Sequence, residues 1–261
     1  MLLHWVIRIM TKFLSIASGK GGVGKTTTAI NLGTALSSFG ADVLVVDGNL
    51  FTPNLGLYLG VQKLPVTIHD AVKGLKHIRE TVYQHSSGLK IIPASISIED
   101  NKNIDIGSLG KIMLDLYGAA QIVLIDSSAG IGEEAKSAIN ASDEMLIVVT
   151  PDSSSIADGL KILNTAMENG VKAKGIIVNR WHEDSEFSLE SIRALFNLPV
   201  SAIPESPEMK KSVLMKQPLV FSHPDCQASI AYKKLAAELM GQEYEHKIER
   251  KGFFERIFSK K

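Results

Sequence analysis

A glycine-rich segment near the start of the chain contains the residue types that bind phosphate. Its members are Gly19, Lys20, Gly21, Gly22, Val23, Gly24, Lys25, Thr26 and Thr27. The glycines let the backbone curl so that successive N–H groups point inward and form a cradle for an anion. At this spacing Lys25 can reach the β- and γ-phosphates of a nucleotide, and the Thr26 hydroxyl can coordinate Mg²⁺. The segment therefore predicts a phosphate-binding loop.

The residues on either side of the loop favour this interpretation. A strand-like apolar run precedes it at residues 13–17, and a helical pattern of apolar residues follows at Ala29, Leu32 and Leu36. Such a loop needs a strand before it and a helix after it, because the helix directs its positive end at the phosphates. The alternative, a glycine-rich turn that happens to carry a lysine, does not account for both flanks.

Two aspartates stand where apolar runs end. Asp126 follows residues 121–125 and Asp47 ends the run 42–47, so both should lie at the carboxyl edge of a sheet, where α/β proteins bind ligands. There Asp126 can hold Mg²⁺, usually through water, and Asp47 can orient water or the metal shell. The alternatives are structural: a turn or cap at Asp126 and a simple Asp-Gly turn at Asp47. The phosphate loop favours the metal site for Asp126.

Strand-like and helix-like segments alternate along the chain. This order predicts a single α/β domain of the P-loop NTPase type, with a mostly parallel, twisted sheet covered by helices on both faces. Strands are expected at residues 13–17, 42–47, 89–93, 121–126, 145–150, 174–179 and 199–204. Helices are expected at residues 154–169 and 228–240, and a polar loop at 101–108. The predicted domain spans residues 10–243.

The composition limits the possible functions. With 261 residues, 45% of them hydrophobic, the chain can bury one substantial core. Its 28 basic and 28 acidic residues balance, which argues against a globally basic nucleic-acid binder. Cys226 is the only cysteine, so no disulfide or cysteine-ligated metal site can form within one chain. This fits a reducing, cytoplasmic compartment.

Both ends of the chain differ from the predicted domain. Residues 1–9 are apolar but too short to span a bilayer. We interpret them as an extension upstream of a natural start at Met10; a membrane or partner segment is the alternative. In the tail, residues 244–261, a helix would gather four apolar side chains in an arc of about 140° beside basic residues: Phe253, Phe254, Ile257 and Phe258. Such a face suits an anionic membrane surface, or else docks on the body of the protein.

Together these motifs resemble the MinD/ParA family of deviant Walker A P-loop ATPases, and most closely its MinD proteins, archaeal ones in particular. The family carries a second lysine early in the phosphate loop, as Lys20 does here. Residues 126–130 are similar to the family's Asp-Ser-Pro-Ala-Gly, with Ser128 in place of proline. Further segments that resemble the family are residues 46–50, 53–56, 150–158, 178–180 and 203–205.

The resemblance implies an ATPase that forms ADP and phosphate with the help of Mg²⁺ and that forms a homodimer through bound ATP. Lys20 would reach the phosphates bound by the other subunit, and Asp158 would transmit the nucleotide state to the partner-binding surface. The implied catalytic residues are Lys20, Lys25, Asp47 and Asn49, and the implied metal ligands are Thr26 and Asp126. The implied adenine-pocket residues are Asn179, Arg180, Pro204 and Glu205.

Position 49 departs from the family pattern. The family has Asp-x-Asp at the end of the second strand, with the second aspartate beside the attacking water, and here that residue is Asn49. An amide can orient water but cannot accept a proton. Asn49 therefore indicates slow hydrolysis, or a variant sequence that traps ATP, and the residues do not separate the two.

The implied function is a membrane-cycling switch that positions cellular machinery, with division-site selection foremost. The protein would be cytoplasmic and would bind reversibly to the inner face of the cell membrane, and a regulatory or cargo protein of unknown identity would read its state. Two alternatives remain: a ParA-like ATPase that partitions DNA by non-specific binding, and a slowly hydrolysing or non-hydrolysing ATP-binding scaffold. Recognition of a specific nucleic-acid sequence is not expected.

Overall fold

One eight-stranded sheet organises the molecule. The computed structural model describes residues 11–61, 64–102 and 104–245. The strands are β1 (Lys12–Ser18), β2 (Val43–Asp47), β3 (Tyr83–Gln84), β4 (Lys90–Ile92), β5 (Ile122–Ala129), β6 (Glu144–Val149), β7 (Lys172–Trp181) and β8 (Val200–Pro204). Their order is β3-β4-β2-β5-β1-β6-β7-β8, and all neighbours are parallel except β3 and β4. The predicted α/β fold with a mostly parallel sheet is therefore confirmed.

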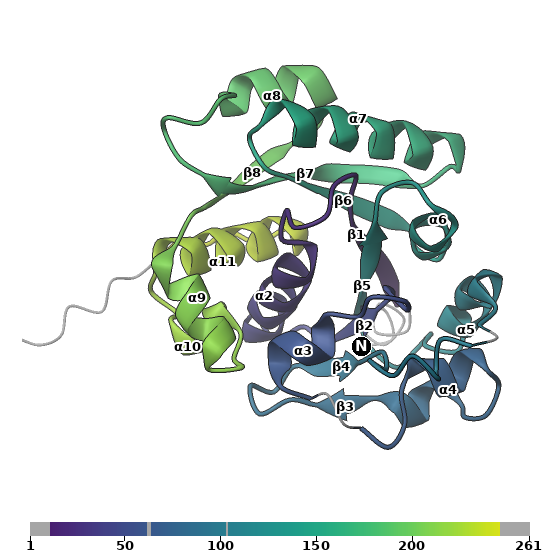
Figure 1. Ribbon diagram of the computed structural model, residues 1–261. Helices are drawn as coiled ribbons and strands as arrows, with labels where there is room; N and C mark the ends of the chain where they lie inside the picture. The colour runs from purple at the N-terminus through teal and green to yellow at the C-terminus, as the bar shows by residue number, and fades with distance from the viewer. Residues whose placement is uncertain (1–10, 62–63, 103, 246–261) are drawn as a thin grey trace, which may run out of the picture.

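Helices cover both faces of the sheet (Figure 1). They are α2 (Lys25–Ser38), α3 (Leu55–Leu59), α4 (Ile68–Val72), α5 (Leu109–Leu114), α6 (Glu133–Asn140), α7 (Ser153–Glu168), α8 (Leu189–Phe196), α9 (Pro207–Leu214), α10 (Leu219–Ser222) and α11 (Gln227–Leu239), with 3₁₀ turns at Ile78–Thr81 and Ile106–Ser108. Within the described residues, no helix combines the length and apolarity that spanning a lipid bilayer requires.

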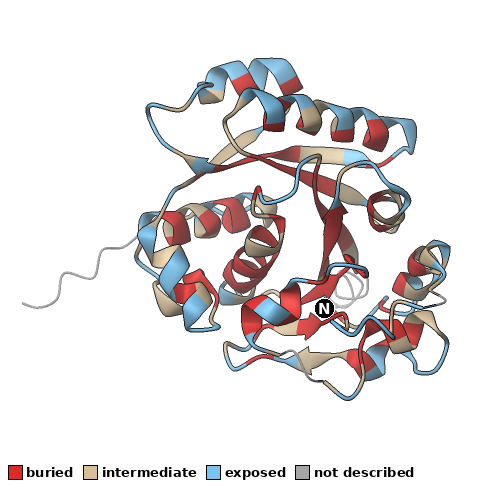
Figure 2. Cartoon of the chain, viewed as in Figure 1, coloured by how far each residue is buried: buried red, intermediate tan, exposed pale blue. Residues whose placement is uncertain are grey.

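The core forms on both sides of the strands, because successive side chains of a strand point to opposite faces. In β2, Val43 and Val45 pack in the cluster that contains residues of α2 and α11. Leu44 and Val46 pack on the other face, with residues of α4 and α5. Burial on both faces explains why the strands read as continuous apolar runs, and Figure 2 shows the buried residues concentrated along them. The carboxyl ends of these strands present the loops described below.

The structure confirms all seven predicted strands, with small differences at their ends. The largest concerns β5, which continues beyond Asp126 because Ala129 still pairs with Ser18 of β1. β3 was not predicted. It is a two-residue antiparallel edge strand and is too short to show the alternation of apolar and polar residues that marks a strand. The predicted polar loop at 101–108 ends in the 3₁₀ turn Ile106–Ser108, where the Asp105 side chain accepts a hydrogen bond from Gly107 N.

The predictions for the chain ends fall almost entirely outside the described residues. Residues 1–9 and 246–261 are not described, so the upstream extension and the membrane-binding tail stay predictions. The beginning of the tail is described: the Tyr244 ring packs edge-to-face on Phe39, with 5.6 Å between ring centroids. Phe39 follows the last residue of α2, so the tail departs from the far end of the helix that begins at the phosphate loop.

Candidate functional site

The loop between β1 and α2 forms a curled cradle at the carboxyl edge of the sheet. Two of its glycines are required by the geometry. Gly24 has φ 101°, and a Cβ there would lie 2.2 Å from the Nδ2 atom of Asn179. A Cβ at Gly19 would lie 2.3 Å from the carbonyl oxygen of Asp158. Helix α2 begins at Lys25 with no side-chain cap, so the N–H groups of its first turn are available to an anionic ligand.

Lys25 places a cation inside this cradle. Its side chain is largely buried, and Nζ donates a hydrogen bond to Ser18 Oγ at 2.9 Å. Burial lowers the pKa of Lys25, whereas the carboxylate of Asp126 acts in the opposite direction. The lysine is therefore held next to the cradle, within the electrostatic reach of a buried acid.

Asp126 is a buried carboxylate whose two oxygens have no hydrogen-bond partner among the described residues. Burial raises the pKa of Asp126 to about 6, and the Thr26 hydroxyl and the Lys25 ammonium limit the rise. Thr26 thus lies close to the carboxylate without making a hydrogen bond of ordinary geometry. A buried, partnerless carboxylate beside a hydroxyl fits a hard cation such as Mg²⁺, which takes oxygen ligands. The described residues contain no group of three or more His, Cys, Asp or Glu side chains that could hold a metal, so water and nucleotide oxygens would have to complete the shell.

Asp47 is the register neighbour of Asp126 on the adjacent strand β2. Its Oδ1 accepts a hydrogen bond from Asn49 N at 3.2 Å, and its Oδ2 accepts one from Leu55 N at 3.1 Å. Burial and the neighbouring Asp126 carboxylate raise the pKa of Asp47, and these backbone hydrogen bonds oppose the rise. In this geometry Asp47 joins the two ends of the loop that connects β2 to α3.

Asn49 lies in that loop, and its side-chain amide is bonded within the same turn. Nδ2 donates to the carbonyl oxygen of Thr52 at 2.6 Å. Oδ1 accepts from Thr52 Oγ1 at 2.9 Å and from Thr52 N at 3.3 Å. Asn49 also lines the cavity over the phosphate loop, which is called the main cavity below, so it faces the region in which a nucleotide would lie.

The main cavity lies over the phosphate loop and measures about 640 Å³. Its lining includes predicted residues: Gly21, Gly22, Gly24, Lys25, Thr26, Thr27, Asn49 and Arg180. It also includes residues that sequence reasoning missed: Leu57 and Tyr58 of α3, Val213 of α9 and Lys216. No local pattern marks these four, because only the packing of α9 next to α3 brings them to the cavity. Lys216 Nζ donates to the carbonyl oxygen of Leu57 at 3.1 Å and closes this wall.

Lys20 lies on the other side of the loop, toward a second cavity of about 500 Å³. Its Nζ is 3.4 Å from Asp152 Oδ1, and both side chains are about two-fifths exposed. The second cavity also contacts Arg180 and Glu205, whereas Pro204 lines a separate cavity beside α11. The structure therefore does not bring Pro204 and Glu205 into the main cavity.

Two of the residues that were expected at the adenine lie near the end of β7, and both support the loop. Asn179 Nδ2 donates to the carbonyl oxygen of Val23 at 2.8 Å. An Arg180 guanidinium nitrogen donates to the carbonyl oxygen of Gly22 at 2.9 Å. Arg180 has φ 57°, a left-handed conformation that is unfavourable for this residue type. The strain is consistent with a side chain held in place by its contact with the loop.

The raised pKa of Asp126 gives a testable pH dependence. Between the ordinary pKa of 3.8 and the folded value of about 6, the folded chain binds more protons than the unfolded chain. The free energy of unfolding without metal should therefore fall as pH rises through this window, by on the order of 2–3 kcal/mol from this group. Asp126→Asn should remove that part of the fall. It should also remove the stabilisation that Mg²⁺ gives with ADP at pH 7.5.

Thermal unfolding from pH 4.5 to 7.5, with and without Mg-ADP, measures both effects. Asp47 also has a raised pKa, so the part of the fall that this second carboxyl causes should persist in the variant. An unchanged pH dependence together with full stabilisation by Mg²⁺ in Asp126→Asn would show that this carboxylate is not the metal ligand.

Comparison with known proteins agrees with the geometry of the loop. Residues 14–219 match the model of the CobQ/CobB/MinD/ParA nucleotide binding domain. An uncharacterized ATP-binding protein of Methanocaldococcus jannaschii is 36% identical, over 94% of each chain. The septum site-determining protein MinD of Pyrococcus horikoshii, solved with Mg-ADP, is 33% identical with a TM-score of 0.84, over 88% of this chain and 96% of that one. MinD in the MinC:MinD complex of Aquifex aeolicus is 30% identical with a TM-score of 0.80, over 91% of this chain and 99% of that one.

Proposed function

Because the chain belongs to the CobQ/CobB/MinD/ParA nucleotide-binding family, we propose that it is an ATPase switch that dimerises with bound ATP and binds membranes reversibly. In this proposal it positions other cellular machinery, with division-site selection foremost. The observation that supports ATP binding and hydrolysis is the cradle of loop N–H groups and Lys25. It lies next to the Asp126 carboxylate, which has no hydrogen-bond partner among the described residues. That arrangement suits a phosphate chain with its metal ion.

The residues of the cradle have distinct roles in this proposal. The loop N–H groups and Lys25 bind the phosphates, and Thr26 and Asp126 hold Mg²⁺. The metal, when bound, neutralises charge that develops on the phosphate oxygens. Asn179 and Arg180 fix the loop through its carbonyl oxygens, and in this proposal they also contact the adenine. A solved relative carries Mg-ADP, which supports nucleotide and metal together at such a loop.

The position of Lys20 supports a site completed by a second subunit. Lys20 does not join Lys25 inside the cradle but forms an exposed ion pair with Asp152. Exposed ion pairs of this kind are weak, so the lysine can leave Asp152 at low cost. A cation supplied by the partner subunit would then stabilise the charge of the transition state, as an arginine finger does in trans.

The cellular role is proposed from the relatives and from the sequence of the tail. The solved relatives include a septum site-determining protein and a MinD bound to MinC. By analogy, we propose that a regulatory or cargo protein reads the ATP-bound dimer. The protein would be cytoplasmic and would attach reversibly to the inner face of the membrane through its basic, aromatic tail.

Asn49 favours a second candidate function, an ATP-binding scaffold that hydrolyses slowly or not at all. Replacing it by aspartate tests this. The Asn49 amide donates to the carbonyl oxygen of Thr52, and a carboxylate oxygen there would repel that carbonyl. Asn49→Asp should therefore leave the turn and place a carboxylate toward the main cavity. We expect it to raise steady-state turnover about tenfold, because it restores a group that can accept a proton from water.

The measurement is phosphate release at saturating Mg-ATP by the full chain and by Asn49→Asp. Thr52→Val, which leaves position 49 unchanged and removes only the hydroxyl bond to Asn49 Oδ1, is the matched control. Measurable turnover by the unaltered chain supports the ATPase. Its absence, with turnover restored by Asn49→Asp, identifies the scaffold. Equal rates in the two proteins would show that position 49 does not limit hydrolysis.

A further inference from the structure

The backbone of Leu50 and Phe51, directly after Asn49, is held by side chains from three separate parts of the fold. His69 of α4 contacts the carbonyl oxygen of Leu50, with Nε2 3.2 Å away. Asn101 Nδ2 donates to the carbonyl oxygen of Phe51 at 3.4 Å, and Glu134 Oε1 of α6 accepts from Phe51 N at 3.1 Å. His69, Asn101 and Glu134 are called the clamp below.

The contacts of His69 define its tautomer. Nδ1 accepts a hydrogen bond from Ser95 N at 3.1 Å, so the ring proton lies on Nε2. That proton is shared between the carbonyl oxygen of Leu50 and Asn101 Oδ1, which is 3.0 Å from Nε2. The ring is 1% exposed, and burial lowers the pKa of His69. His69 is therefore neutral at physiological pH and acts as a donor toward the loop.

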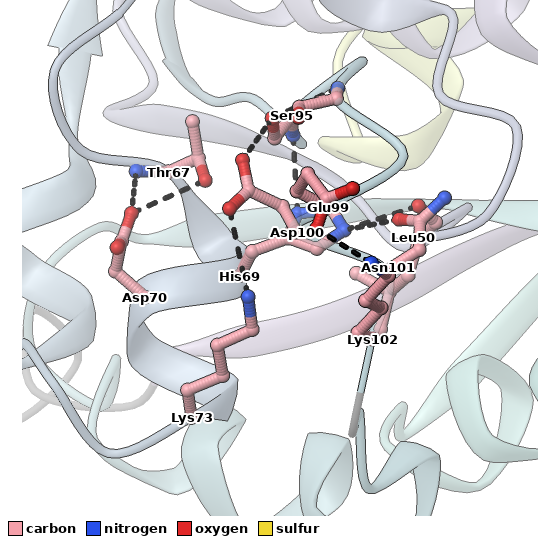
Figure 3. A network of polar contacts seen from close by, with 11 residues as sticks. Leu50, Thr67, His69, Asp70, Lys73, Ser95, Glu99, Asp100, Asn101 and Lys102 are labelled. Atoms are coloured by element: carbon pink, nitrogen blue, oxygen red, sulfur yellow. Dashed lines mark hydrogen bonds and ion pairs between the residues drawn. The ribbon is translucent and has the colours of Figure 1, made fainter.

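A surrounding network keeps His69 and Asn101 in place (Figure 3). Ser95 Oγ donates to Asp100 Oδ2 at 2.6 Å, which orients the segment whose N–H meets the imidazole. Lys73 is 3.5 Å from Asp100 Oδ1, and this joins α4 to the same segment. His69 and Asn101 thus lie beside residues that are themselves hydrogen-bonded or ion-paired, which is what accurate positioning of a functional group requires.

The clamp acts where packing of the loop is incomplete. Leu50 is fully buried and anchors the loop, but Phe51 is 42% exposed. Apolar packing therefore does not fix the orientation of the Phe51 peptide groups. Two of the three clamp contacts are made to those groups.

We propose that the clamp positions Asn49 for ATP hydrolysis, a role that rests on the proposed ATPase function. Asp47 holds the backbone N–H of Asn49 on one side, and the clamp holds the two residues that follow it. The side chain of Asn49 is tied to Thr52, so the turn moves as a unit. The three clamp residues are positioning residues, because they act on the turn and not on the nucleotide. A displacement of about 1 Å at such a group can lower a rate on the order of 100-fold.

Two amide substitutions of His69 separate positioning from folding. The amide of glutamine extends to about the place of Nε2 and can donate to Leu50, whereas the amide of asparagine reaches only about the place of Nδ1. His69→Asn should lower kcat about tenfold with little change in KM, and His69→Gln should stay within about twofold of the unaltered chain. Glu134→Ala should also lower kcat about tenfold. Glu133→Ala is the matched control, since Glu133 is exposed and its side chain forms an ion pair only with Lys136 among the described residues.

The assay is steady-state ATP hydrolysis by the full chain, with ATP affinity from a fluorescent ATP analogue and thermal unfolding of each variant. Lower kcat in both His69→Asn and Glu134→Ala, with unchanged ATP affinity and rescue in His69→Gln, supports the clamp. Normal kcat in either variant overturns it. Equal loss of kcat and of stability in His69→Asn and His69→Gln also overturns it, because that result indicates a structural histidine. If neither the unaltered chain nor Asn49→Asp hydrolyses ATP, the proposed function fails, and the clamp fails with it.

Discussion

Lys20→Ala is expected to lower ATP turnover at least about 100-fold while leaving the affinity of each subunit for Mg-ATP nearly unchanged. The reason is the placement of Lys20. Its ammonium lies outside the phosphate cradle, paired with Asp152 at 3.4 Å, so it contributes little to binding within its own subunit. In a dimer that closes around ATP, the same ammonium would meet the developing charge on the partner's phosphoryl oxygens. Removing it should therefore affect the transition state far more than the bound substrate.

A mixing experiment distinguishes whether Lys20 acts on the nucleotide bound by the partner subunit or on the nucleotide bound by its own subunit. Lys20→Ala retains its cradle but cannot supply the cation, and Lys25→Ala supplies the cation but has a damaged cradle. Each alone should be nearly inactive, and mixing them should restore turnover, because the cradle of one meets the Lys20 of the other. Lys12→Ala is the matched control, since Lys12 is also exposed and ion-paired but lies at the opposite end of β1. Mixtures that remain inactive would show that Lys20 does not act across the interface.

The parts of the site that lie close together in sequence could be predicted. The phosphate loop joins a strand to a helix within a short segment, so its glycines, lysines and threonines place one another through local backbone geometry. Asp126 was predicted from the apolar run before it, because parallel strands end at a common edge. These inferences need only the pattern of apolar residues along the chain and the common edge at which parallel strands end.

The remaining parts depend on packing between distant segments. Tyr58 and Lys216 meet at the main cavity because α9 packs beside α3, and no pattern in either segment indicates this. The contact between Glu134 and Phe51 joins residues that are 83 positions apart. Glu134 looks from sequence like an ordinary acidic residue in the first turn of a helix, which the helix dipole favours in any case. Such roles become visible only when the fold brings the second residue into contact.

Asn49 shows where family resemblance alone is incomplete. The resemblance identifies the position but not the state of the side chain. The structure shows both ends of the Asn49 amide bonded to Thr52, an arrangement that the residue type permits and aspartate does not. The departure from the family pattern therefore affects the hydrogen bonds within the turn as well as the chemistry of position 49.

Removal of residues 246–261 is expected to abolish ATP-dependent membrane binding while leaving ATP binding intact. A chain that ends at Glu245 retains every described residue, including Tyr244 on Phe39 at the end of α2. It loses the aromatic and basic residues whose spacing predicts an amphipathic helix. One short helix binds lipid weakly, but two on one dimer bind together, and avidity of this kind raises apparent affinity by about 10²–10⁴. ATP should thus control attachment to the membrane, because dimerisation brings two tails together in one molecule.

Sedimentation with liposomes of anionic lipid, in ATP or ADP, measures this effect. The unaltered chain should sediment in ATP far more than in ADP, and the shortened chain in neither. A full-length chain with Phe254→Ser and Phe258→Ser should match the shortened one, because the apolar face is interrupted while the basic residues remain. Zwitterionic liposomes control for the charge requirement. Persistent ATP-dependent sedimentation of the shortened chain would place the membrane anchor elsewhere in the dimer. If both chains fail to sediment but still dimerise with ATP, the dimer acts away from the membrane.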